Sequence, residues 1–313
     1  MPETVGEWTA MQLICTSVKV NARMLITDAQ VHVWEAHRPD RPWPSENQGK
    51  PSFVAVPGAR PHRAEPINGL EMTSMMNSAG VSRAIIVPPS PVGDSNLFAL
   101  ETAAKYPDRF LVMGRFNPTA AGALTQLPSW RDQAYMAGIR MTFHKPEWAN
   151  WFADGVLEGF WRSCENYRIP VMLLAPGRMT EIDLIASRYP NLTLIVDHLG
   201  MHSHHRDTDC GEDLKTVLPL ARHPNVSIKT SAVTCYTTEP FPFRNFNGYL
   251  EAIYQSFGPR RMLWGSDVSR LPCTYIEAVT HFTETLDFIS KEDLPWVMGR
   301  SLSALLKWPE PNE

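Results

Sequence analysis

Eight short apolar runs recur along the chain and alternate with stretches of helical pattern. The runs are rich in Val, Ile, Leu and Met and do not alternate between apolar and polar residues, which is typical of parallel strands that are buried on both faces. Eight strand–helix repeats in about 280 residues predict a (β/α)8 TIM barrel. An open doubly wound sheet is the alternative, but no GxGxxG or P-loop motif follows any run. The runs span residues 24–34, 82–90, 110–118, 138–144, 169–176, 191–200, 225–233 and 261–267.

The chain of 313 residues is long enough for two domains, but (β/α)8 barrels often form one domain of ~250 residues. We expect a single barrel over residues 24–309 and a poorly ordered N-terminal extension over residues 1–23. The connection after the first run, from Trp34 to about Asn68, is rich in Pro, Arg and Trp and is longer than most loops. We expect this long loop to be either a substrate-covering lid or a structural or oligomer-contact arm.

Charge and cysteine content exclude several classes of protein. A net charge of -4 and a pI near 6.2 favour neither nucleic acid nor an anionic membrane as a partner. Five widely spaced cysteines without a CxxC motif indicate reduced thiols rather than a disulfide framework or a zinc knuckle. No apolar run approaches the ~18 residues that cross a bilayer, and the chain begins without a signal-peptide pattern. These features predict a cytoplasmic protein and leave a homo-oligomer open.

Polar side chains end several of these apolar runs. Gln30 and His32 lie two residues apart in the first run, so they share one face of the strand. His198 ends the sixth run and Asp267 ends the eighth. The carboxyl ends of all barrel strands meet at one mouth, where active sites are built. A lone residue of this kind is often a helix cap or a hydrogen-bonded core group, but together they predict a catalytic site of His32, His198 and Asp267.

Further polar residues near the strand ends are candidates for binding the substrate. Arg140 and Lys145 lie near the end of the fourth run, and Lys229 lies in the seventh with Tyr236 just beyond it. A guanidinium such as that of Arg140 can bind a carboxylate through two parallel hydrogen bonds. Arg140 and Lys229 would be structural if they satisfied backbone carbonyls instead. The candidates for an aromatic pocket wall are Trp34, Trp43 and Phe53.

The segments "DAQVHVW", "VDHLG" and "WGSD", in this order, resemble the amidohydrolase superfamily in the branch called amidohydrolase 2. The long Trp- and Pro-rich loop and the "GIR" strand are also similar to that branch, and the resemblance spans about residues 24–308. The branch contains 2-pyrone-4,6-dicarboxylate lactonase, sugar-acid lactonases and metal-dependent decarboxylases. The resemblance therefore implies a TIM barrel with a hydrolytic or related activity at its mouth.

The superfamily pattern has His-x-His on strand one, His on strands five and six, and Asp on strand eight. The three predicted catalytic residues match it, whereas Gln30 replaces the first histidine, and Leu173 or Leu174 stands where the strand-five histidine is sought. Because two imidazoles are missing, and because the lactonase subgroup works without a metal, we expect no obligatory metal cofactor. If a divalent metal such as Zn or Mn is bound, its expected ligands are His32, His198 and Asp267.

The function that the resemblance implies is hydrolysis of a small carboxylated lactone from aromatic or sugar-acid breakdown. Asp267 is the expected general base that activates a water molecule. His32 and His198 are expected to stabilise the oxyanion on the attacked carbonyl. Arg140 is expected to bind a substrate carboxylate, and Gln30 is a further substrate-binding candidate.

Three other functions stay open on the sequence. A metal-dependent decarboxylase or hydratase of an aromatic or unsaturated acid would use the same site. A thiol enzyme would use Cys235 or Cys273, which follow strands seven and eight. A non-catalytic barrel that binds a small acid would explain the missing histidines. The remaining histidines, in "HLGMHSHHRDTD", are interpreted as part of a solvated loop: His202, His204 and His205.

Overall fold

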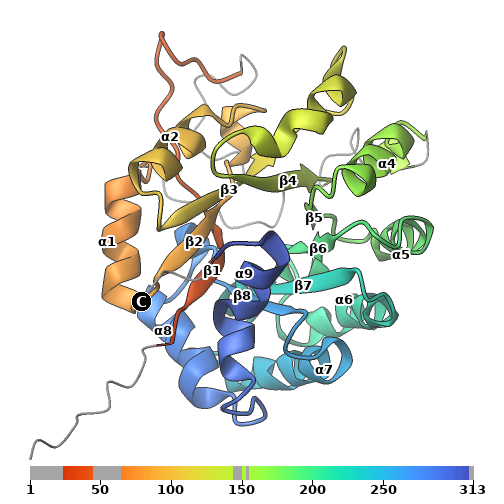
Figure 1. Ribbon diagram of the computed structural model, residues 1–313. Helices are drawn as coiled ribbons and strands as arrows, with labels where there is room; N and C mark the ends of the chain where they lie inside the picture. Colours follow the sequence, from red (N-terminus) through yellow and green to blue (C-terminus); the bar gives the residue numbers. More distant parts are fainter. Residues whose placement is uncertain (1–23, 45–64, 144–149, 153–154, 310–313) are drawn as a thin grey trace, which may run out of the picture.

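The computed structural model describes residues 24–44, 65–143, 150–152 and 155–309 (Figure 1). Eight parallel strands form one sheet in the order β1 to β8, each paired with the next along the chain. β8 returns to β1, where Asp267 N donates a hydrogen bond to Gln30 O at 2.9 Å. The predicted (β/α)8 barrel is therefore confirmed. The strands are β1 Thr27–Val31, β2 Arg83–Ile86, β3 Phe110–Arg115, β4 Met136–Thr142, β5 Val171–Leu174, β6 Leu194–Val196, β7 Val226–Ser231 and β8 Met262–Gly265.

Helices surround the sheet on its outside (Figure 1). The first one illustrates how the sequence sets their ends: the Asn68 side chain accepts hydrogen bonds from Leu70 N and Glu71 N, and Gly80 ends the helix with left-handed backbone. No helix in the described part of the chain is long and apolar enough to span a bilayer. The α-helices are α1 Gly69–Ala79, α2 Leu97–Lys105, α4 Glu158–Asn166, α5 Met179–Arg188, α6 Cys210–Val217, α7 Asn247–Phe257, α8 Tyr275–Thr280 and α9 Ser301–Leu306.

The strands bury apolar side chains on both faces. An outer core between the sheet and the helices contains residues such as Val112 and Ile139. A smaller inner core fills the barrel itself. This two-sided burial explains why the strand sequences are continuously apolar. Seven strand residues and Val87, which follows β2, contribute to the inner core. The strand residues are Ala29, Ile85, Met113, Ala137, Met172, Ile195 and Leu263.

The C-terminal segment closes the end of the barrel at which the strands begin. Leu302 and Leu306 of α9 belong to the inner core. Arg83, the first residue of β2, donates from Nη1 to Pro309 O at 2.6 Å, and its guanidinium lies 4.7 Å from the centre of the Trp308 ring. Because this end is covered, polar chemistry is left to the opposite end, where the strands stop.

The alternation of strands and helices predicts a helix that ends near Ala137, and the segment before β4 differs from this prediction. It forms a 3-10 helix over Ala123–Asp132, and β4 already begins at Met136. Pro128 lies inside this segment, where it lacks the N–H of an α-helical hydrogen bond, so tight 3-10 turns replace the α-helix.

The predicted extension, residues 1–23, and residues 45–64 of the long loop, which include Phe53, lie outside the described residues. Trp34 and Trp43 are described, and both are buried in the outer core. Trp34 N also donates to Ile67 O at 3.0 Å, which joins the two ends of the long loop. These two tryptophans therefore help to fix the loop against the barrel.

Candidate active site at the mouth of the barrel

His32, His198 and Asp267 come together at the carboxyl end of the barrel, and we call them the mouth cluster. His32 Nε2 lies 3.1 Å from Asp267 Oδ1, and His198 Nε2 lies 3.7 Å from Asp267 Oδ2. All three side chains are at most 6% exposed. One buried carboxylate from the end of β8 thus lies between imidazoles from the ends of β1 and β6.

Left-handed backbone shapes the strand ends around this carboxylate. His198, Ala232 and Asp267 follow β6, β7 and β8, and their φ angles are 50°, 55° and 54°. Residues with a Cβ rarely adopt this region, which costs about 1–3 kcal/mol, and such residues cluster at active sites. Three consecutive strands therefore end in strained turns at the same place.

His32 presents a ring nitrogen without a fixed hydrogen to Asp267. Its Nδ1 donates to Val87 O at 2.6 Å. Gln30 Nε2 lies 3.2 Å from His32 Nε2, and the amide is oriented because Gln30 Oε1 accepts from Lys229 Nζ. In neutral His32 the Nε2 atom therefore carries a lone pair, and its contact with Asp267 Oδ1 becomes a hydrogen bond only when a proton lies between them.

Asp267 is ionised in this environment. Burial alone would raise the pKa of its carboxyl, but the contact with His32 and the charge of Arg270 outweigh burial and hold the pKa well below its usual value. Arg270 Nη1 lies 3.2 Å from Asp267 Oδ2. In return, burial acts to lower the pKa of Arg270, but the Asp267 charge outweighs it and keeps the guanidinium protonated. The site thus holds a stable carboxylate with one oxygen open toward the imidazoles.

His198 is a neutral imidazole. Burial lowers its pKa to about 3, although the charges of Asp267 and Asp197 act in the opposite direction. Its Nδ1 lies 2.8 Å from Ser231 Oγ, at the end of β7. When the serine hydroxyl donates to Nδ1, the ring carries its hydrogen on Nε2, facing the mouth. His198 can then donate to an oxygen that gains negative charge.

Lys229 places an ammonium group inside the barrel. Its Nζ donates to Asp197 Oδ1 at 2.8 Å and to Gln30 Oε1, and Arg140 Nε donates to Asp197 Oδ2 at 3.2 Å. Burial acts to raise the pKa of Asp197, but Lys229 and Arg140 lower it overall. Burial lowers the pKa of Lys229, and Asp197 opposes this shift. A buried carboxylate is therefore held between two cations of the protein itself.

The predicted substrate-binding residues are placed differently from one another. Arg140 is occupied by Asp197 and donates from Nη1 to Thr142 Oγ1 at 2.6 Å. Gln30 links Lys229 to His32, so it positions the mouth cluster. Tyr236 is buried, and burial raises the pKa of its phenol. Trp34 packs in the outer core, as described above, and Lys145 lies outside the described residues.

Arg115, at the end of β3, is a site residue that the sequence did not indicate. It pairs in register with Arg140, so both arginines face the same side of the sheet. Its Nε and Nη1 atoms are buried and have no hydrogen-bond partner in the described structure. Burial and the charge of Arg140 lower the pKa of Arg115 to about 9. A buried guanidinium with open donors is a costly arrangement that binding of an anion would relieve.

The mouth cluster does not fit a resident divalent cation. A metal-binding group needs one ligand atom from each of three residues, all within 4.8 Å of one another. Within the described part of the chain, the three residues of the mouth cluster do not meet this criterion. The amide oxygen of Gln30 is occupied by Lys229, and Arg270 neutralises Asp267. The donor set is thus small, spread apart and already supplied with positive charge.

Strand β5 supplies no metal ligand either. Leu173 packs in the outer core and Met172 in the inner core, where its Sδ lies 3.5 Å from Lys229 Nζ. Leu174, the last residue of the strand, is half-buried. Aliphatic and thioether side chains therefore stand where an imidazole would be needed, as the sequence indicated.

The cysteines beyond β7 and β8 lack the environment of a catalytic thiolate. Cys235 Sγ donates to Arg270 O at 3.4 Å. Cys273 Sγ donates to Thr234 Oγ1 at 3.5 Å, and burial raises the pKa of its thiol. A catalytic cysteine needs a depressed pKa, so this geometry does not favour the thiol alternative.

The fold and the site together define a barrel hydrolase, with an ionised carboxylate between two imidazoles at the carboxyl ends of parallel strands. Comparison with protein-family models agrees, since residues 27–300 match the model Amidohydro_2, described as amidohydrolase. The matched range includes the whole mouth cluster. The chain belongs to this amidohydrolase family, and the resemblance found in the sequence is confirmed.

The chain is also similar to three known proteins. It is 24% identical over 247 residues to L-fucono-1,5-lactonase of Burkholderia ambifaria, covering 78% of this chain and 81% of that one. An amidohydrolase of Burkholderia multivorans, solved with bound zinc, is 19% identical with a TM-score of 0.72, over 91% of this chain and 100% of that one. A probable 2-pyrone-4,6-dicarboxylic acid hydrolase of Acinetobacter baumannii, solved with citric acid, is 18% identical with a TM-score of 0.68, over 91% and 100%.

Proposed function

We propose that the protein hydrolyses a small carboxylated lactone and that Asp267 activates the attacking water. The observation that carries this proposal is a buried, ionised carboxylate whose Oδ1 has no fixed donor and which lies between two imidazoles. Relatives named as an L-fucono-1,5-lactonase and a 2-pyrone-4,6-dicarboxylic acid hydrolase support the substrate class. The activity would serve the breakdown of aromatic or sugar acids in the cytoplasm.

Each residue of the mouth cluster has one role in the proposed reaction. A water molecule at Asp267 Oδ1 loses a proton to the carboxylate while its oxygen attacks the lactone carbonyl. His32 Nε2 shares this proton, and His198 Nε2 donates a hydrogen bond to the developing oxyanion. The ring C–O bond then breaks, the leaving oxygen takes the proton from Asp267, and a hydroxy acid is released. A positioned base contributes ~10²–10⁴ in rate and one oxyanion donor ~10²–10³.

We assign the substrate carboxylate to Arg115 rather than to Arg140. Arg140 already holds Asp197 and Thr142, whereas Arg115 has two buried N–H groups that find no partner among the described residues. A bidentate contact would satisfy both of these groups and offset the repulsion between the two guanidiniums. The citric acid bound to the Acinetobacter relative supports a carboxylated ligand in this family. Trp34, Lys145 and Tyr236 remain predicted substrate contacts.

We also propose that this reaction needs no metal at the mouth. Lys229 and Arg270 supply positive charge beside Asp197 and Asp267, and the Gln30 oxygen is already occupied. The bound zinc of the Burkholderia multivorans relative makes metal removal an essential part of any test. A decarboxylase or hydratase would instead depend on a divalent ion.

The proposal is tested by assaying wild-type protein and Asp267→Asn on a panel of carboxylated and uncharged lactones, before and after treatment with a chelator. Wild-type activity should survive the chelator, and Asp267→Asn should lower kcat by at least ~10²-fold because the base is lost. Asp183→Asn, in a surface ion pair, is the matched control and should retain full activity. Activity of Asp267→Asn within tenfold of wild type would remove Asp267 as the base.

Arg115→Gln separates binding of the carboxylate from the chemistry. Losing a charge-assisted bidentate contact should raise KM for carboxylated lactones by about 10–100-fold, and the uncharged lactones should be unaffected. An equal loss on both kinds of lactone would contradict the role of Arg115 as the carboxylate anchor. Loss of all activity on metal removal, with decarboxylation restored by an added divalent ion, would favour the decarboxylase.

A further inference from the structure

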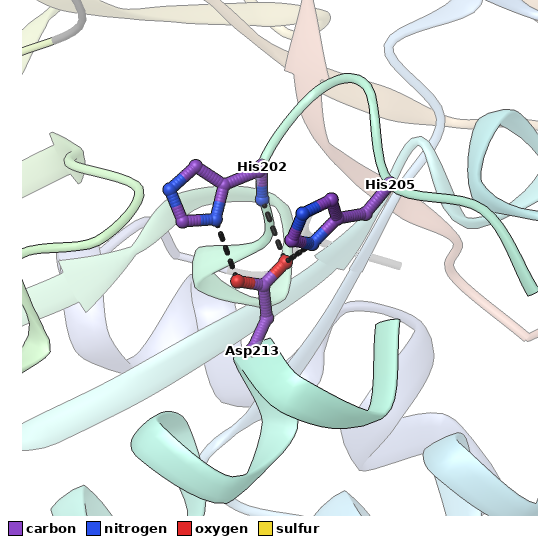
Figure 2. Close-up of side chains that lie close together, drawn as sticks. All are labelled: His202, His205 and Asp213. Carbon is purple, nitrogen blue, oxygen red and sulfur yellow. Dashed lines mark hydrogen bonds and ion pairs between the residues drawn. The ribbon is translucent and has the colours of Figure 1, made fainter. Parts of the chain in front are cut away.

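A second group of two histidines and one aspartate lies in the region after β6. We call His202, His205 and Asp213 the rim cluster (Figure 2). The side chains of His202 and His205 are 35% and 24% exposed, and that of Asp213, near the start of α6, is 7% exposed. Both histidines are partly exposed, as a solvated loop predicts, but an aspartate of the following helix also binds both of them. His204 alone is exposed.

Figure 2 shows that both imidazoles turn the same ring atom toward the carboxylate. His202 Nδ1 lies 2.6 Å from Asp213 Oδ1, and His205 Nδ1 lies 2.7 Å from Asp213 Oδ2. The backbone N–H of His202 also donates to Oδ2 at 2.9 Å, which fixes the carboxylate. The two nitrogens and one carboxylate oxygen all lie within 4.8 Å of one another. Two metal-binding nitrogens and an anionic oxygen thus converge on one point.

We propose that the rim cluster is a binding site for a divalent late transition metal, with zinc as the ion that fits best. The ligands are His202 Nδ1, His205 Nδ1 and one oxygen of Asp213. Zinc takes imidazole nitrogen and carboxylate oxygen at ~2.0–2.2 Å in tetrahedral geometry, which places ligand atoms about 3.3 Å apart. The contacts of 2.6 and 2.7 Å between the rings and Asp213 would therefore lengthen when the ion binds. The fourth ligand is water or His204, whose ring centre lies 4.6 Å from that of His205.

The proton balance of this binding is simple. In the structure the Nδ1 hydrogens lie between the rings and the carboxylate. The metal replaces these hydrogens, so a neutral ring moves its hydrogen to Nε2 and a doubly protonated ring releases one proton. Space for the His202 ring is provided by Gly177, since a Cβ there would lie 3.0 Å from His202 Nε2.

A second histidine–aspartate contact in the chain, between His223 and Asp183, has a different counter-charge from the rim cluster. Asp183 accepts from His223 Nε2 at 2.8 Å and from Arg222 Nη2 at 2.5 Å, so a guanidinium already neutralises it. In the described structure the ion pairs of Asp213 are with imidazoles alone. An imidazole can exchange its hydrogen for a metal, whereas a guanidinium cannot.

The position of the cluster indicates a structural role for the metal. The ion would tie the segment after β6 to α6, a few residues beyond His198. The same segment is already joined to the one after β7, because Asp207 Oδ1 accepts from Thr238 N at 2.9 Å and from Asn245 Nδ2 at 2.7 Å. Metal binding would therefore lock one wall of the mouth without taking part in the reaction.

The test uses the full chain without a histidine tag and measures binding of zinc alone by titration calorimetry after chelator treatment and dialysis. Wild-type protein should bind one zinc per chain, and zinc should raise the melting temperature. X-ray absorption of the zinc-loaded protein should show only nitrogen and oxygen neighbours at ~2.0–2.2 Å. Asp213→Asn and His205→Gln should each weaken zinc binding by at least ~10-fold, because each removes a direct ligand and even the loss of an outer partner typically costs ~10–100-fold.

Two control variants locate the ion. His223→Gln removes a histidine from a histidine–aspartate pair elsewhere, and Asp267→Asn alters the mouth cluster; both should bind zinc as wild type does. Thermal melts without metal verify that every variant is folded. The proposal is overturned if wild-type protein binds no zinc, if both rim variants bind it unchanged, or if Asp267→Asn abolishes binding.

Discussion

The mouth cluster and the rim cluster contain the same residue types, two histidines and one aspartate, yet their surroundings differ. At the mouth, Asp267 has a guanidinium beside it, and Arg270 Nη1 lies 3.2 Å from its Oδ2. At the rim, the ion pairs of Asp213 within the described residues are with its two histidines. The mouth is almost fully buried, whereas the rim histidines are partly open to solvent.

This difference teaches that residue type alone does not decide whether a site suits a metal. A buried carboxylate must be neutralised, because an isolated buried charge is very costly. The mouth meets this requirement with arginine and lysine from the chain itself, which leaves Asp267 available as a base. At the rim the partners of the carboxylate are imidazoles, and an external cation can replace the ring hydrogens that face it.

The largest effect is expected for Lys229→Met, which removes the built-in cation next to the mouth. Asp197 would remain buried with Arg140 as its remaining ion-pair partner, and the Gln30 oxygen would lose its donor. Breaking a buried ion pair from one side costs about 3–5 kcal/mol, so the free energy of unfolding in urea should fall by that amount.

Lys215→Met on α6 is the control for this measurement, since Lys215 and Glu212 form an ion pair that is more than 70% exposed on both sides. Such pairs contribute about 0–1 kcal/mol. If the two substitutions had equal effects, Lys229 would not be the charge that neutralises the interior, and the contrast between mouth and rim would lose its basis.

The strand ends show how much of the site could be predicted from the sequence. His32, His198 and Asp267 interrupt apolar runs, and barrel topology brings the ends of all strands together, so their meeting was predictable. The position of Gln30 beside His32 followed from the alternation of strand side chains. The spacing of apolar residues can be seen directly in the sequence, and the number of strand–helix repeats predicts the barrel.

The partners of the arginines could not be predicted in this way. The sequence predicts that Arg140 faces the substrate, and its long side chain also reaches Asp197, the residue that follows β6. Arg115 is the last residue of β3, and nothing in the sequence distinguishes it from other strand ends. It is distinguished by buried guanidinium nitrogens that have no hydrogen-bond partner among the described residues. Arg270 lies three residues after Asp267, and no sequence pattern predicts the left-handed backbone of Asp267. These contacts depend on side-chain reach across the barrel, which spacing along the chain does not fix.

An intermediate effect is expected for Asp28→Asn, which tests the role of counter-charges at the mouth. Asp28 accepts hydrogen bonds from Gln30 N, Ser266 N and Tyr275 Oη, all neutral donors, and burial raises its pKa from 3.8 to about 6. A raised carboxyl pKa stabilises the fold at low pH, and this contribution is lost as the pH rises through about 6. Two pKa units correspond to about 3 kcal/mol.

The measurement is urea unfolding of wild type and Asp28→Asn at pH 4.5 and pH 7. Wild type should lose stability relative to the variant as the pH rises, because only wild type must then bury an ionised carboxylate. A difference between the two proteins that stays constant with pH would contradict the shift, and with it the argument that a buried carboxylate here needs a cation.

The smallest effect is expected for Gln30→His, which restores a His-x-His pair on β1. In an Asp213→Asn background, where zinc binding at the rim is expected to be weak, this substitution should add no zinc binding that calorimetry detects. The ammonium of Lys229 still lies at this position and repels a divalent ion. Adding Lys229→Met removes that charge, and the combined variant should then gain zinc affinity at the mouth. If Gln30→His alone bound zinc as tightly as the wild-type rim does, the number of imidazoles would decide metal binding, and the counter-charges that separate the two clusters would be incidental.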